Sequence, residues 1–260
     1  LLSINKSFFD DKFSLSFNLG ASILDDKNDG EGFEGHLATL ANKFSVYNVD
    51  MSHSQTKPYA DRYHDQTQAV YATAQLGYNG MVYLDVTARN EWASQLAFTP
   101  HMNIFYPSVG LSAVVTEMVK LPRWISFLKL RGSYAEVGSP LPQYLSSATY
   151  QFNSSTGYYE TYTRFVPDKL YPEMTRSWEV GMDLRLWQER LTLDITYYKS
   201  NTNKQTFQIP ISGSSGYSSM VVQSGCVQNK GVEAVLGVKL RSGDFSYNAS
   251  FAYTLNRNKI

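Results

Sequence analysis

Apolar and polar residues alternate along several stretches of the chain with a period of two. In residues 13–23 every odd position is apolar, from Phe13 to Ile23, and the even positions are Ser, Asn or Gly. This period is typical of a β-strand with two different faces, whereas an amphipathic helix repeats about every 3.6 residues. The pattern recurs in 82–89, 178–186, 191–198, 232–240 and 245–254. We therefore predict an all-β chain.

The same alternation, followed from one end of the chain to the other, predicts about ten strands. They lie near residues 1–8, 13–24, 67–79, 81–92, 104–117, 126–137, 174–187, 190–202, 226–241 and 244–257. Most reach the roughly 9–11 residues that a tilted strand needs to cross a bilayer. Strands of soluble sandwiches average about five or six residues. Strand length thus favours an antiparallel transmembrane β-barrel.

The predicted connections alternate strictly between short and long. Short ones fall near 10–11, 79–80, 120–125, 188–189 and 242–243, and long ones span 24–66, 93–103, 138–173 and 203–224. The dipeptide Asn79-Gly80 is the one preferred in tight hairpins. Outer-membrane barrels have short turns on the periplasmic side and long loops outside, whereas a sandwich has no reason to sort its loops in this way.

The polar face of the predicted strands carries charged side chains. They are Asp85, Arg89, Lys129, Arg131, Glu179, Asp183 and Arg185. In a transmembrane barrel, lipid covers the apolar face and the polar face borders the lumen. We expect these seven residues to face the lumen.

Composition supports a membrane wall and argues against several other classes. Charged residues make up 18% of the chain, below the roughly 25% of soluble domains. The formal net charge is zero, so no basic field favours nucleic acid. No apolar run reaches the roughly 18 residues of a membrane-spanning helix. A single cysteine, Cys226, cannot form an internal disulfide.

Candidate chemistry is sparse. The four histidines, His36, His53, His64 and His101, fall in predicted loops and lack the spacing of a zinc site. No serine is grouped with a histidine and a polar orienting residue, so we predict no metal, no cofactor and no enzymatic activity.

One predicted loop is rich in aromatic residues. These are Tyr150, Phe152, Tyr158, Tyr159, Tyr162 and Phe165. Tyrosine combines apolar area with a hydrogen-bonding tip, which suits stacking on sugar rings or docking a protein lid. The alternative is that these aromatics pack the loop onto itself.

Several motifs resemble the SusC/RagA-type family of TonB-linked outer-membrane transporters. They are YLDVTARNEW at 83–92, FYPSVGLSA at 105–113, FLKLRGSY at 127–134, RSWEVGMDL at 176–184 and QNKGVE at 228–233. Their order and spacing cover most of the chain.

The resemblance implies a barrel of about 22 strands around an N-terminal plug, in the outer membrane of a Gram-negative bacterium. It also implies coupling to a TonB complex, a SusD-like surface lipoprotein as lid, and import of glycans or peptides. We expect residues 1–260 to be a barrel segment, with the plug and the C-terminal closing strands outside it. A passive porin and a soluble secreted β-sheet adhesin are the alternatives.

Overall fold

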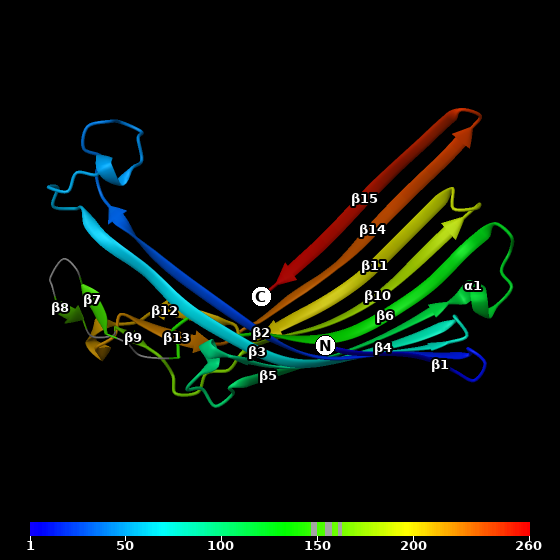
Figure 1. The fold of residues 1–260 in the computed structure, drawn as a ribbon, viewed down its shortest axis with the longest axis horizontal. Coiled ribbons are helices and arrows are strands. Elements are labelled where there is room, and N and C mark those ends of the chain that lie inside the picture. The colour runs from blue at the N-terminus through cyan, green and yellow to red at the C-terminus, as the bar shows by residue number, and fades with distance from the viewer. Residues whose placement is uncertain (147–149, 154–157, 161–162) are drawn as a thin grey trace.

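The computed structural model describes residues 1–146, 150–153, 158–160 and 163–260. Ten long strands form one antiparallel sheet, in which each strand pairs with the next long strand along the chain (Figure 1). They are β1 (Leu2–Phe8), β2 (Phe13–Glu34), β3 (Lys57–Tyr78), β4 (Val82–Ala93), β5 (Asn103–Val114), β6 (Ile125–Ser139), β10 (Glu173–Leu186), β11 (Leu191–Asn203), β14 (Cys226–Ser242) and β15 (Phe245–Lys259). The prediction of an all-β antiparallel fold with ten long strands is confirmed.

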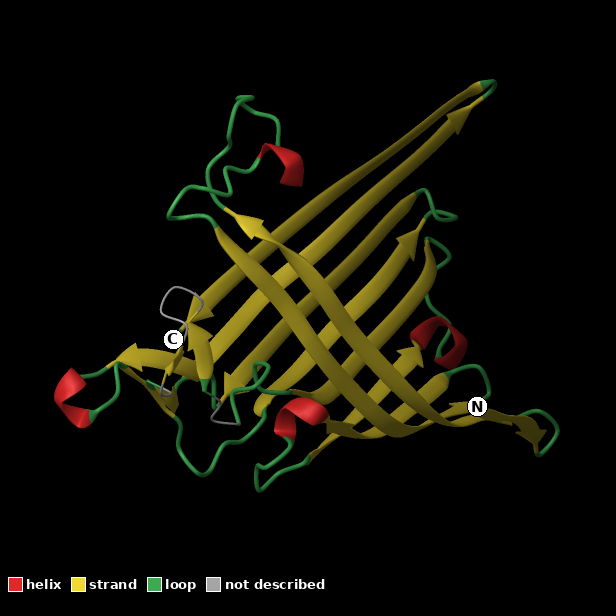
Figure 2. Ribbon diagram, turned by 60° about the vertical axis from the view of Figure 1, so that its left-hand side comes forward, coloured by secondary structure: helices red, strands yellow, loops and turns green. Residues whose placement is uncertain are grey.

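The sheet is a single curved layer (Figures 1 and 2). Its register brings apolar side chains of successive strands into rows, such as Leu128, Leu184, Leu193, Leu236 and Phe251. These rows stay open, since Leu111, Val180 and Phe251 are 55%, 56% and 61% exposed. A second layer would bury them, as in a soluble sandwich. The described residues place no such layer there, which agrees with a membrane wall.

The turns and loops alternate between short and long as predicted except after β5, where the connection at 115–124 is no shorter than the predicted long one at 94–102. The hairpin at 79–81 also differs from the prediction. Asn79 and Gly80 have φ values of 49° and 68°, the left-handed conformations that this dipeptide adopts in tight hairpins. The connection is three residues long, because Met81 lies outside both strands. The connection after β5 contains a short helix, α1 (Val115–Met118), where the sequence predicted the end of a strand.

The predicted loop at 24–66 is wrong at both of its ends. β2 and β3 continue as a paired hairpin to Glu34 and from Lys57, so that only 35–56 connects them. Both faces of this extension are polar, so it has no alternation of apolar and polar residues. Polar contacts hold it instead: the Arg62 guanidinium meets Asp29 at 2.7 Å and the His64 ring meets Asp25 at 2.6 Å. His64 therefore lies in a strand and not in a loop.

The long loops at 140–172 and 204–225 contain short strands that the alternation did not predict. A small sheet joins β12 (Thr206–Pro210), β13 (Ser219–Gln223) and β9 (Arg164–Phe165), and β7 (Gln151–Asn153) pairs with β8 (Tyr158–Glu160). The part of the chain that the structure describes also contains three single turns of 3-10 helix, each in a different loop: η1 (Val46–Asn48), η2 (Ser94–Leu96) and η3 (Gly213–Ser215). Strands of two to five residues are too short to show a period.

The hydrophobic core of the described residues lies among these loops. It contains Ala93, Leu96, Ile104, Leu141, Leu145, Leu170 and Val221. Leu96 comes from the loop between β4 and β5, Leu170 from 140–172 and Val221 from 204–225. The loops therefore pack on one another at one end of the sheet.

Candidate functional site

The strand register places all seven predicted charged residues on one face of the sheet. Lys129 stands opposite Asp183, and Glu179 stands opposite Ser133, two positions from Arg131. Asp85 pairs in register with Gly110, and Gly110 pairs with Ser133, so Asp85 lies on the same face. We call the face that carries these residues the polar face.

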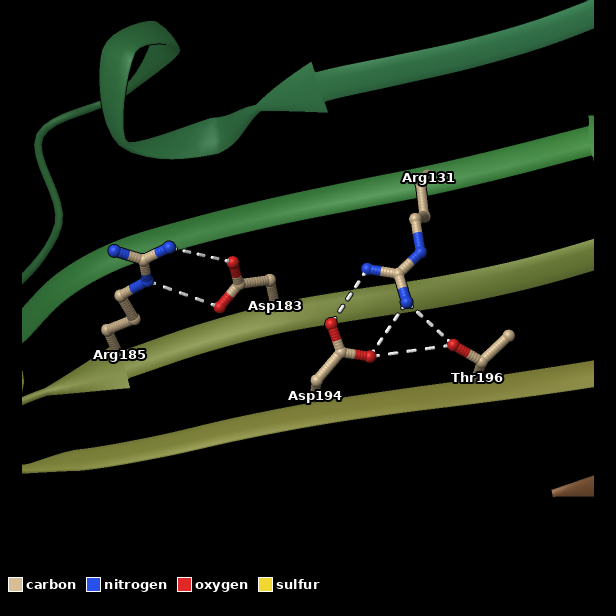
Figure 3. Close-up of polar contacts among 5 residues, drawn as sticks. All are labelled: Arg131, Asp183, Arg185, Asp194 and Thr196. Atoms are coloured by element: carbon tan, nitrogen blue, oxygen red, sulfur yellow. Dashed lines mark hydrogen bonds and ion pairs between the residues drawn. The ribbon is translucent and has the colours of Figure 1, made fainter. Parts of the chain in front are cut away.

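A network centred on Arg131 bridges three strands of the polar face (Figure 3). Arg131 on β6 reaches across β10 and donates two hydrogen bonds to the Asp194 carboxylate on β11, at 3.0 and 2.7 Å. It donates a third to the Thr196 hydroxyl at 2.7 Å. Gly181 on β10 leaves room for this reach, because a Cβ there would lie 2.7 Å from Arg131 Nε. Two-point pairing of this kind fixes the guanidinium plane.

The other two predicted arginines of the polar face are also paired. Arg185 contacts Asp183 at 3.2 Å and Glu189 at 3.0 Å. Arg89 contacts Glu91 at 2.7 Å and lies over the ring of Tyr71. All three predicted arginines of the polar face are therefore held by carboxylates.

Other residues of this face were not among the seven predicted to face the lumen. Asp194 and Thr196 occupy polar positions of β11. Asn18 joins three strands, since it accepts a hydrogen bond from Ser3 at 2.7 Å and donates one to Thr73 at 3.2 Å. The alternation predicted all three on the polar side of their strands, but it did not predict their contacts.

The predicted aromatic residues are distributed over the loop at 140–172. Tyr150, Tyr158 and Tyr159 are 71%, 76% and 73% exposed. The ring of Phe165 contacts that of Tyr217 from the neighbouring loop, with the centroids 5.4 Å apart. Tyr162 and the side chain of Phe152 lie outside the described residues. No single cluster of all six is therefore established.

Tyr171, an aromatic residue of the same loop that is not among the six, makes several contacts with other loops. Its ring lies 4.7 Å from that of His101 and 3.8 Å from Lys204 Nζ. Its backbone exchanges hydrogen bonds of 2.8 and 2.6 Å with the side chain of Gln223. These contacts join three loops at the same end of the sheet.

In the loop at 35–56, hydrogen bonds from the Ser52 hydroxyl and backbone N–H hold the pKa of Asp50 below its usual range. Across the described ranges, no three His, Cys, Asp or Glu residues are grouped in a way that would hold a metal ion. Within the same ranges, no helix has the length and apolar character needed to cross a membrane.

Comparison with protein families places this architecture. Residues 4–260 match the model of the TonB dependent receptor-like β-barrel. The chain belongs to this family. The family resemblance found in the sequence is thereby confirmed, and TonB-dependent receptors are outer-membrane proteins of Gram-negative bacteria.

Two curated TonB-dependent receptors of Formosa agariphila resemble the chain over almost its whole length. TonB-dependent receptor P3 is 25% identical over 273 residues, covering 100% of this chain and 26% of its own length. TonB-dependent receptor P39 is 25% identical over 271 residues, covering 98% of this chain and 25% of its own. The chain thus spans about a quarter of the length of these relatives.

Solved TonB-dependent receptor structures share the fold. A chain of the RagAB peptide transporter superposes with a TM-score of 0.79 at 20% identity, over 99% of this chain and 29% of that one. The siderophore receptor PirA of Pseudomonas aeruginosa gives 0.58 at 14% identity, over 98% and 41%. At these identities the similarity concerns the fold alone.

Proposed function

We propose that residues 1–260 form part of the barrel wall of a TonB-dependent importer in the outer membrane. The observation that carries this proposal is the single-layered sheet, with one exposed apolar face and one face of paired charges. Such a sheet is stable when lipid covers the first face and water the second. Membership in the TonB-dependent receptor family implies that a TonB complex supplies the energy for import, through a region outside this segment.

In this arrangement the polar face borders the lumen. Asp85, Arg89, Lys129, Arg131, Glu179, Asp183 and Arg185 then line the passage or contact a plug domain within it. Pairing of the arginines limits the net charge of the wall. A bulky polar solute therefore meets fixed dipoles and little uncompensated charge.

The packed loops form the outer mouth, and the nutrient is a glycan or an oligopeptide too large for passive diffusion. Exposed Tyr150, Tyr158 and Tyr159 offer rings for stacking and hydroxyls for hydrogen bonds. Similarity to the fold of the RagAB peptide transporter supports a peptide and a SusD-like surface lipoprotein as lid.

The test is deletion of the gene in its host, followed by growth on a panel of glycans and oligopeptides as sole nutrients. We expect loss of growth on one class and its restoration by the wild-type gene. Unchanged uptake of every compound would contradict import.

A second strain separates active import from a passive porin. In a host that lacks TonB, an importer stops taking up its nutrient, whereas a porin continues. A soluble adhesin is distinguished by fractionation, because it would leave the membrane without detergent.

A further inference from the structure

Three positively charged residues stand side by side on the apolar face of the sheet, at the end nearest the long loops. Lys199 on β11 pairs in register with Lys230 on β14, and Lys230 pairs with Arg257 on β15. Neighbouring strands lie about 4.8 Å apart, so the three Cα atoms span about 10 Å. We call Lys199, Lys230 and Arg257 the basic row.

The basic row begins where the apolar band ends. One step closer to the turns, the same face of these strands carries only Tyr197, Val232 and Leu255. From Leu255 to Phe245 the apolar face of β15 covers about 33 Å of strand, or about 25 Å of height at a tilt near 40°. This is the height of the apolar band of outer-membrane barrels.

On the neighbouring strands β10 and β6, aromatic residues occupy the same register row as the basic row. Lys199 stands opposite Trp178, and Trp178 stands opposite Tyr134. Tryptophan and tyrosine gather where hydrocarbon meets headgroups. The basic row therefore lies at the depth of the lipid headgroups.

The charges of the basic row have no counterpart within the described part of the chain. None of its salt bridges includes Lys199, Lys230 or Arg257. The nearby acid on this face, Glu136, is paired with Arg176 at 3.2 Å. On the polar face, Arg89, Arg131 and Arg185 contact carboxylates, and Lys129, which takes part in no salt bridge of the described residues, stands opposite Asp183.

We propose that the basic row binds the phosphate groups of a lipid in the outer leaflet of the membrane. This inference rests on the membrane placement proposed above. Lysine and arginine stems lie along apolar surface while their heads reach the headgroup level, and phosphate oxygens accept charge-assisted hydrogen bonds from them. Because the strands are tilted, the three residues differ in depth along the membrane normal by only about 6 Å. One headgroup with two phosphates, or two neighbouring headgroups, can therefore contact all three residues.

The experiment uses the full-length protein, purified in a neutral detergent, with lipid A as the probe. The test variant is K199Q/K230Q/R257Q. The control variant K120Q/R123Q/K239Q removes the same charge from exposed positions at the turn end of the sheet. We expect the test variant to bind lipid A about tenfold more weakly or worse, because each basic residue adds appreciably to binding at an anionic surface. The control variant should bind like the wild type.

Two further arms keep the proposal falsifiable if the test variant does not fold. Enzymatically dephosphorylated lipid A should lose most of its binding to the wild-type protein. The charge-preserving variant K199R/K230R/R257K should retain lipid A binding. Equal binding of both lipids to the wild type, or equal binding of lipid A by the wild type and a folded test variant, would overturn the proposal.

Nutrient uptake, measured in the same variants, separates this proposal from the transport function. A test variant that imports normally but binds lipid A poorly supports the basic row as a lipid site. If the wild type binds lipid A through the row but the gene deletion leaves all uptake unchanged, the import function fails and the lipid site stands.

Discussion

At the scale of single residues, Arg131 shows how one side chain couples three strands. Its guanidinium crosses β10 only because Gly181 has no side chain there. Arg131 and Asp194 are 38% and 43% exposed, so solvent screens their attraction and the pair stabilises the sheet modestly. Its main effect is geometric, because two hydrogen bonds to one carboxylate fix the orientation of the guanidinium across β10.

We expect Asp194→Asn to reduce the free energy of unfolding by about 1 kcal/mol or less, as for other exposed ion pairs. Gly181→Leu should produce a similar loss, since its side chain displaces Arg131. In a double-mutant cycle with Arg131→Gln, the coupling energy should be about 0.5–1 kcal/mol. The measurement is denaturant unfolding of the full-length protein in lipid.

Glu233→Gln is the matched control for this pair. Glu233 stands opposite Thr196 in the same register row and takes part in none of the salt bridges of the described residues. Its replacement should leave stability almost unchanged. A loss equal to that of Asp194→Asn would show that general charge, and not the Arg131 contact, matters.

At the scale of elements, consecutive residues of a long strand belong to opposite faces of the sheet, which we propose to border lipid and water. On β14, Leu236 lies in an apolar row between Leu193 and Phe251, whereas Val235 stands opposite Asp194 on the polar face. Since adjacent side chains point to opposite faces, a substitution at one of the two positions tests one face only.

Leu236→Arg should destabilise the protein by roughly 2–4 kcal/mol, the cost of an arginine near the bilayer midplane. Val235→Arg should cost little, because its side chain enters the polar face beside Asp194. Urea unfolding in lipid vesicles measures both. Equal costs at the two positions would contradict the assignment of lipid to one face.

At the scale of the whole molecule, the wall and the mouth are stabilised in different ways. In the proposed placement the wall depends on inter-strand hydrogen bonds and on lipid, whereas the loops have their own hydrophobic core. Leu96, Leu170 and Val221 are 0%, 2% and 1% exposed within it. Perturbing this core should therefore loosen the mouth and spare the sheet.

Leu170→Ala should cost about 2–5 kcal/mol of loop stability. We expect faster amide hydrogen exchange in 94–102 and 204–225, with protection of β10, β11 and β14 unchanged. Leu40→Ala is the control, because Leu40 is 52% exposed in another loop. Increased exchange throughout the long strands would show that mouth and wall unfold together.

Alternation along the sequence was enough to predict the ten strands, their two faces and most of the sorting of short and long connections, although not the longer connection after β5. The alternation is local to each strand, because every second side chain lies on the same face and the hydrophobic effect selects apolar residues there. It can be recognised without knowing which strand pairs with which. The charged residues of the polar face followed from the same rule, which also places Asp194 on the polar side of its strand, although its pairing with Arg131 across β10 has no signal in the sequence.

Other features depend on contacts between residues far apart in the sequence and arise only in the folded chain. The extension of β2 and β3 rests on cross-strand polar contacts such as that of Arg62 with Asp29. The loop core brings together Leu96, Leu170 and Val221 from three separate loops, and the basic row exists only because the register aligns three strands. The strand extension, the loop core and the basic row leave no repeating pattern in the sequence. Their residues come together only when the chain folds.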